Sequence, residues 1–150
     1  MKYIYWVVLL AGFISLVAYC NHAAEKRMEI IDRVMQNDLV IRGKLVDTKT
    51  SSNHSFGILL LNVDSVKTGK FRDTVLEHGR YPYKIKDGKA EIYLHVPYGI
   101  QKGDQVIIDS DKKTAFYHYS RGNKVYTGDL GVVVDPYDID YVKENTIFKH

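Results

Sequence analysis

The segment YPYKIKDGKAEIYLH, residues 81–95, carries the strongest structural signal in the chain. At its centre, Asp87 and Gly88 suit the positive φ angles of a type I′ turn, which joins two strands through a two-residue loop. With this turn, the expected cross-strand pairs are Tyr81–Leu94, Tyr83–Ile92 and Ile85–Ala90 on one face, and Arg80–His95 and Lys84–Glu91 on the other. The first set is apolar and the second polar, so the segment predicts a hairpin with one face in a core and the other in water.

Strand-type periodicity continues over most of the chain after residue 38. The expected strands are Leu39–Val46, Phe56–Val66, Tyr81–Lys86, Ala90–Val96, Gln105–Asp109, Thr114–Tyr119, Lys124–Thr127 and Leu130–Val134. Phe56–Val66 offers apolar groups to both faces, which is typical of a central strand or of one that curls into a barrel. Residues 38–150 are therefore expected to form a mainly β domain, either a small barrel (an OB-like barrel included) or a sandwich.

An almost unbroken apolar run occupies Tyr3–Cys20. About 18 residues at 1.5 Å each reach roughly 27 Å, close to the hydrocarbon thickness of a bilayer. Tyr3, Tyr5 and Trp6 suit the headgroup level, which favours an anchor, but a short basic start before an apolar core is also typical of a secretory signal peptide. Residues 1–22 are expected to be a transmembrane anchor or a signal segment, and either would carry the β-domain out of the cytoplasm.

Cys20 is the single cysteine, and it closes the sequence Leu16-Val17-Ala18-Tyr19-Cys20. This sequence resembles the lipobox of bacterial lipoproteins, and the resemblance implies a lipid on Cys20. The family has Gly, Ala or Ser before the lipidated cysteine, whereas Tyr19 stands there in this chain. The alternative is that Cys20 is an apolar residue of a spanning helix.

Residues 23–37 favour a helix, because good helix formers open the segment and no Gly or Pro interrupts it. Met28, Ile31, Val34 and Met35 recur at three- and four-residue steps and would form one apolar stripe. This short amphipathic stalk would pack against the β-domain or against a second copy of itself in a homodimer.

Val96–Asp109 joins an apolar strand, a loop, the turn Lys102-Gly103-Asp104 and a second strand. This arrangement resembles the compact barrel domains of uncharacterised exported, lipoprotein-like proteins of Bacteroidetes. The resemblance implies a membrane or cell-envelope setting. It implies no functional residues.

The common catalytic signatures do not occur in the sequence. It has no H-E-x-x-H, G-x-S-x-G, C-x-x-C, P-loop or G-x-G-x-x-G. We therefore assign no catalytic residue and no cofactor, and favour binding over catalysis. The alternatives are a metal-dependent or hydrolytic envelope enzyme, in which His95 and His118 meet across a sheet, and a small structural subunit of a membrane complex.

Asp135, Asp138 and Asp140 place three carboxylates within six residues. Hard oxygen ligands so arranged could hold Ca²⁺, although the glycine and terminal glutamate of an EF-hand loop are missing. The alternative is a solvated turn after the expected strand Leu130–Val134.

Tyr93, His95, Tyr98 and Tyr117 are the candidate contact surface, because tyrosine supplies contact area at little entropic cost. Residues 42–124 carry fifteen bases against nine acids, which would suit nucleic acid, but an exported domain is not expected to meet it. The expected partners are the bilayer, through residues 3–20, and an envelope protein. The predicted function is that of a membrane-tethered binding or assembly module.

Overall fold

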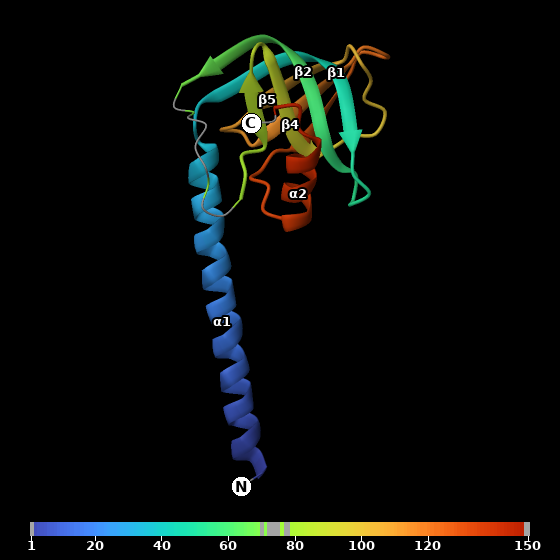
Figure 1. Cartoon of the computed structure of the whole chain (residues 1–150). Helices are drawn as coiled ribbons and strands as arrows, with labels where there is room; N and C mark the ends of the chain where they lie inside the picture. The colour runs from blue at the N-terminus through green and yellow to red at the C-terminus, as the bar shows by residue number, and fades with distance from the viewer. Residues whose placement is uncertain (1, 70, 72–75, 77–78, 149–150) are drawn as a thin grey trace. The chain divides into compact units, whose positions relative to one another are not determined.

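The computed structural model describes residues 2–69, 71, 76 and 79–148, which form two units, Met1–Val34 and Met35–His150. The helix α1, Lys2–Met35, is one continuous helix, with no break between the apolar run and the expected stalk (Figure 1). By length and composition α1 could cross a membrane or act as a signal helix, and in the described part of the chain no other helix could. The dimeric stalk stays a prediction.

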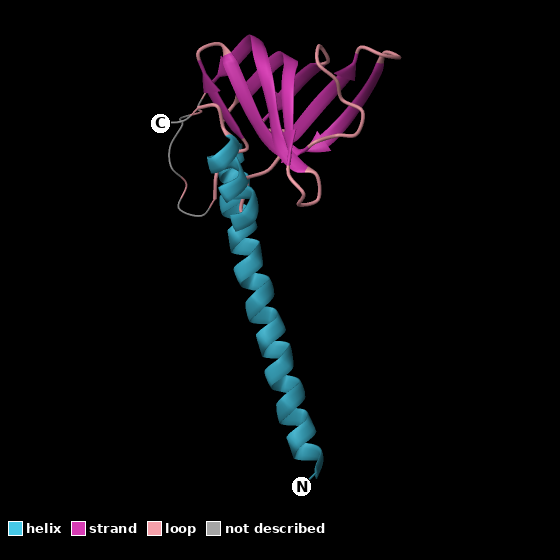
Figure 2. Ribbon diagram, turned by 45° about the vertical axis from the view of Figure 1, so that its right-hand side comes forward, coloured by secondary structure: helices cyan, strands magenta, loops and turns pink. Residues whose placement is uncertain are grey.

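The described part of the second unit is mainly β, as expected. Its elements are β1 Leu39–Thr50, β2 Phe56–Thr68, β3 Tyr83–Lys86, β4 Lys89–His95, β5 Gln105–Asp109, β6 Thr114–Tyr119, β7 Lys124–Asp129 and α2 Pro136–Asn145. The strands form one antiparallel sheet in the order β3-β4-β2-β1-β5-β6-β7, drawn in magenta in Figure 2. The sheet is open, because its outer strands β3 and β7 do not pair with each other.

The β3–β4 hairpin has the predicted turn and register. Asp87 and Gly88 have φ angles of 51° and 72°, as a type I′ turn requires. The observed pairs include Tyr83–Ile92, Lys84–Glu91 and Ile85–Ala90. The expected pairs Tyr81–Leu94 and Arg80–His95 do not form, because β3 begins only after Pro82, which has no N–H to donate. Arg80 instead forms an isolated β-bridge with Val133.

The long strand β1 changes register twice against β2, between Arg42 and Gly43 and between Leu45 and Asp47. Such bulges bend a strand and increase its twist. The first bulge depends on glycine, because a Cβ atom at position 43 would lie 2.4 Å from the backbone oxygen of Asn62. The two bulges allow β1 to pair with β2 along its length and with β5 over Val40–Lys44.

The main core lies on one face of the sheet and draws residues from six of the seven strands. Its buried members are Met35, Leu39, Ile41, Leu45, Leu59, Leu61, Tyr83, Ala90, Ile92, Leu94, Val106, Ile108, Ala115, Tyr117 and Leu130. The alternating pattern of the sequence places these side chains together, since side chains two residues apart along a strand share a face.

A second, smaller core lies on the opposite face of β2 and β4, where α2 packs. Phe56, Ile58 and Tyr93 from the sheet meet Val133 and Val142 there. The strand and the turn predicted for this region were wrong. Residues 130–134 form no strand beyond the Val133 bridge, and the acidic stretch begins a helix instead of a solvated turn. Asp135 caps that helix and Pro136 occupies its first turn, and both residues favour a helix start.

Because α2 covers this face, the side of β4 expected to face water is buried, and Glu91 is only 1% exposed. Its carboxylate accepts hydrogen bonds from the Tyr93 hydroxyl at 2.8 Å, the Thr146 hydroxyl at 2.5 Å and the Ile147 N–H at 2.8 Å. Three donors compensate the loss of water around the carboxylate. Glu91 therefore holds the segment after α2 against β4.

Replacing Glu91 by alanine should lower the free energy of unfolding by about 3 kcal/mol or more, because buried donors lose their acceptor. The matched control is Glu144→Ala on the exposed surface of α2, which should change it by less than about 0.5 kcal/mol. Urea denaturation of the full chain in mild detergent, monitored by tyrosine fluorescence, measures the free energy of unfolding of both variants. Equal stability of the two variants would show that the Glu91 hydrogen bonds do not hold the C-terminal segment.

Candidate functional site

A hollow rich in aromatic residues lies at the β6–β7 end of the sheet and has a volume of about 560 Å³. Its lining residues, which we call the tyrosine pocket, are Pro97, Tyr98, Gly99, Tyr117, Tyr119, Arg121, Lys124, Tyr126 and Thr127. They come from β6, β7, the turn between them and the loop after β4. Four of the nine are tyrosines, so ring faces and hydroxyls dominate the surface that a ligand would meet.

Strand pairing explains why the tyrosines gather. Tyr117 lies opposite Tyr126 and Tyr119 opposite Lys124, so all four side chains share one face of the β6–β7 hairpin. Tyr117 belongs to the main core and is 2% exposed, whereas Tyr126 is 49% exposed. The rings of Tyr119 and Tyr126 meet edge to face with centroids 5.1 Å apart. The pocket therefore lies where the core face of the sheet becomes exposed to solvent.

The loop after β4 supplies the other wall of the pocket. The Tyr119 hydroxyl donates a hydrogen bond of 3.0 Å to the backbone oxygen of Tyr98. Gly99 follows with a φ of 80°, a conformation that glycine adopts without strain. The Tyr98 side chain itself is fully exposed. The loop backbone is thus tied to β6, and one ring remains free to contact a partner.

Asp104 holds both walls of the pocket in place. Its carboxylate is only 2% exposed. It accepts hydrogen bonds from the N–H of Gln101 at 2.8 Å, and from the N–H and hydroxyl of Ser120 at 2.8 and 2.7 Å. Burial alone would raise the pKa of Asp104, but these hydrogen bonds favour the charged form, and the pKa lies below its ordinary value. Asp104 is a positioning residue for the loops that carry Tyr98 and Arg121.

The charge of the tyrosine pocket comes from two cations. Burial raises the pKa of the Tyr117 and Tyr119 hydroxyls, so both stay neutral at physiological pH. Arg121 and Lys124 are the charged lining residues, and neither forms an ion pair with a residue that the structure describes. Arg121 also attracts the buried carboxylate of Asp104 and helps to lower its pKa. Flat ring faces beside two cations suit a ligand that combines apolar or planar groups with negative charge.

The structure separates the four residues predicted as a contact surface. Tyr98 and Tyr117 line the tyrosine pocket, although Tyr117 is buried within it. Tyr93 is also buried, at 1% exposure, because α2 covers its face of β4. His95 is exposed elsewhere, with Nδ1 3.0 Å from the backbone oxygen of His54. The expectation of one exposed surface made of these four residues was therefore wrong.

Tyr119, Arg121, Lys124 and Tyr126 complete the pocket and were not singled out from the sequence. The signal that could have found them is the turn Arg121-Gly122-Asn123, which predicts a hairpin. Pairing the two strands across that turn brings Tyr117 and Tyr119 to the same face as Tyr126.

The residues predicted to bind a metal have other roles. Asp135 accepts from the N–H of Tyr137 at 2.8 Å as a helix cap, Asp138 accepts from Asn53 at 3.0 Å, and Asp140 pairs with Lys143 at 2.8 Å. His95 and His118 lie on β4 and β6, which three strands separate in the sheet order. Within the described ranges, no group of three or more His, Cys, Asp or Glu side chains is placed to hold a metal ion.

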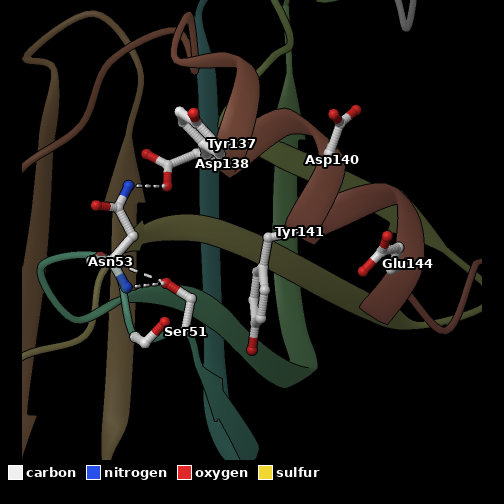
Figure 3. Close-up of a pocket in the computed structure, with 8 residues that line it drawn as sticks. Ser51, Asn53, Tyr137, Asp138, Asp140, Tyr141 and Glu144 are labelled. Carbon is white, nitrogen blue, oxygen red and sulfur yellow. Dashed lines mark hydrogen bonds between the residues drawn. The ribbon is translucent and has the colours of Figure 1, made fainter.

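A second, more polar hollow of about 540 Å³ lies between the β1–β2 turn and α2. Figure 3 shows the Asn53 amide pointing toward the Asp138 carboxylate, the hydrogen bond that joins the turn to the helix. Lys49 adds a second link, because its Nζ donates to the backbone oxygen of Asn145 at 2.6 Å. These contacts hold α2 against the sheet, which gives this hollow a structural role.

Cys20 lies within α1, and the helix continues on both sides of it. Its lipidation stays a prediction.

Comparisons of the chain with family models, with curated proteins and with solved structures gave no match.

Replacing Asp104 by asparagine should lower the free energy of unfolding at neutral pH by about 2 kcal/mol, because hydrogen bonds to a charged acceptor are lost or weakened. The folded-state pKa of Asp104 is lowered, so its contribution to stability is complete above the unfolded pKa of about 4 and is lost as the pH falls through the folded pKa. The wild-type protein should lose stability below about pH 5, and the variant should lose less.

The matched control is Asp47→Asn. The pKa of Asp47 is also lowered, first by a hydrogen bond from Lys102, but the two side chains are 49% and 75% exposed, so this pair should contribute little to stability. Denaturation of the full chain at a series of pH values measures the free energy of unfolding of the wild type, Asp104→Asn and Asp47→Asn. The same pH dependence in wild type and Asp104→Asn would contradict the role of Asp104.

Proposed function

We propose that this protein is a membrane-tethered binding or assembly module of the bacterial cell envelope, in which α1 is the anchor and the β unit binds a partner through the tyrosine pocket. The observation that carries the proposal is the pocket itself. It is open, it is lined by four tyrosines and two cations, and its lining includes no carboxylate.

The chemistry of the lining residues favours binding over bond making. Tyrosine rings supply contact area with few rotatable bonds, and the raised pKa values of Tyr117 and Tyr119 keep their hydroxyls protonated. Protonated hydroxyls of this kind are poor general bases at neutral pH. They can donate hydrogen bonds to a ligand, as Tyr119 does to the loop backbone.

A membrane anchor would favour binding of a membrane partner by such a site. The apolar length of α1 supports a tether, and a tether confines the pocket to the membrane surface, which raises its effective concentration toward other membrane proteins. The partner is therefore expected to be another protein of the envelope, on the side of the membrane away from the cytoplasm.

The anchor predicts how the full chain behaves in fractionated cells. It should stay in the membrane pellet after extraction with alkaline carbonate, because an apolar helix holds it there. Protease added outside the cytoplasmic membrane of intact spheroplasts should digest the β unit. Release of the chain by carbonate would contradict the anchor, and protection of the β unit until the spheroplasts are lysed would contradict its orientation.

A photo-crosslinking amino acid at position 98 tests the pocket in the full chain expressed in cells. We expect one discrete envelope protein to be crosslinked, because Tyr98 is the most exposed ring of the pocket. The matched control is the same amino acid at Tyr137, which is 79% exposed on α2 and outside the pocket. The same set of products from both positions, or none from position 98, would contradict the proposed site.

A further inference from the structure

The strand β7 is a free edge of the sheet. It ends the strand order and pairs only with β6, and no turn, loop or cap hydrogen bond between described residues involves its backbone. Val125 and Tyr126 are 54% and 49% exposed. An edge of this kind presents unpaired N–H and C=O groups to which another extended chain can bind.

The free edge and the tyrosine pocket share residues. Lys124, Tyr126 and Thr127 belong to β7 and also line the pocket. In a strand added beside β7, every second side chain would lie on the pocket face, close to Tyr126. The main chain of such a strand would bond to β7 while its side chains met the rings, which is how peptides are recognised by strand addition.

The charged residues at and near β7 determine which kind of strand could bind to this edge. Arg121, in the β6–β7 turn, and Lys124, at the start of β7, have no described ion-pair partner, and the one carboxylate of the strand, Asp129, lies at its other end. The opposite edge, β3, is only four residues long, and its tyrosine, Tyr83, is buried, so Lys84 and Lys86 are its charged groups. A segment with acidic side chains on its pocket face would complement the two cations.

We propose that β7 binds an extended, acidic segment of a partner protein as an additional antiparallel strand, with its acidic side chains on the pocket face beside Arg121 and Lys124 and its apolar side chains on the opposite face. This inference names the kind of partner for the proposed binding module and rests on that function.

The probe is a short synthetic peptide of alternating Glu and Val, labelled with a fluorophore and titrated against the full chain in detergent. Two further versions carry N-methyl groups, one on the amides of the Glu residues and one on those of the Val residues. Successive amides of a strand point in opposite directions, so only one set would face β7. We expect binding of the unmodified peptide, loss of binding for one methylated version and retention for the other.

The variant Arg121→Glu with Lys124→Glu tests the charge. It should weaken binding of the unmodified peptide roughly tenfold, since two exposed charge pairs are reversed, and a peptide of alternating Lys and Val should bind the variant better than the wild type. The matched control is Lys86→Glu with Lys89→Glu, which makes the same charge change at the exposed β3–β4 turn and should leave binding unchanged.

Strand addition is overturned if both methylated versions bind as well as the unmodified peptide, if the control variant loses as much affinity as the pocket variant, or if the Glu–Val peptide does not bind at millimolar concentration. Crosslinking of a partner at position 98 would then still support a binding module that uses another mode of contact. Loss of crosslinking together with retained peptide binding would instead contradict the proposed cellular role and leave the edge as a strand-binding site.

Discussion

Burial of β4 on both faces is the constraint on which the rest of the β unit depends. One face of this strand supplies Ala90, Ile92 and Leu94 to the main core, and the other supplies Glu91 and Tyr93 to the layer beneath α2. A carboxylate buried without partners would cost several kcal/mol, so Glu91 is tolerable only where donors surround it. Tyr93, Thr146 and Ile147 provide those donors.

Because of this arrangement, the two ends of the sheet differ in what covers their strands. At the β2–β4 end, α2 and the segment after it cover the outer face, and the polar groups there are paired within the protein. At the β7 end no described element covers the strand, and the core face opens into the tyrosine pocket. Asp104 keeps that opening in shape by binding the backbone of both its loops. The closed end supplies stability, and the open end remains available to a partner.

The sequence predicted the features that depend on local patterns, and missed those that depend on which elements become neighbours. The Asp87-Gly88 turn and the alternation around it determine the hairpin register, because both act within a few residues. Glu91 was placed in water, since alternation identifies a face but not what covers it. The helix α2 was missed because Asp135 and Pro136, a capping pair, also resemble an acidic turn. The pocket was recognised only in part, through Tyr98 and Tyr117, because its other residues are brought in by pairing of β6 with β7.

Amide hydrogen exchange of the full chain in detergent, resolved by residue, tests this difference between the two ends most directly. We expect the slowest exchange in residues 90–94 of β4 and in residues 56–61 of β2, where the side chains on both faces are buried or half-buried, and exchange at least roughly a hundredfold faster for the outward-facing amides of β7. Protection of β7 equal to that of β2 in the free protein would contradict the central claim, because it would mean that the edge proposed to receive a partner strand is already paired.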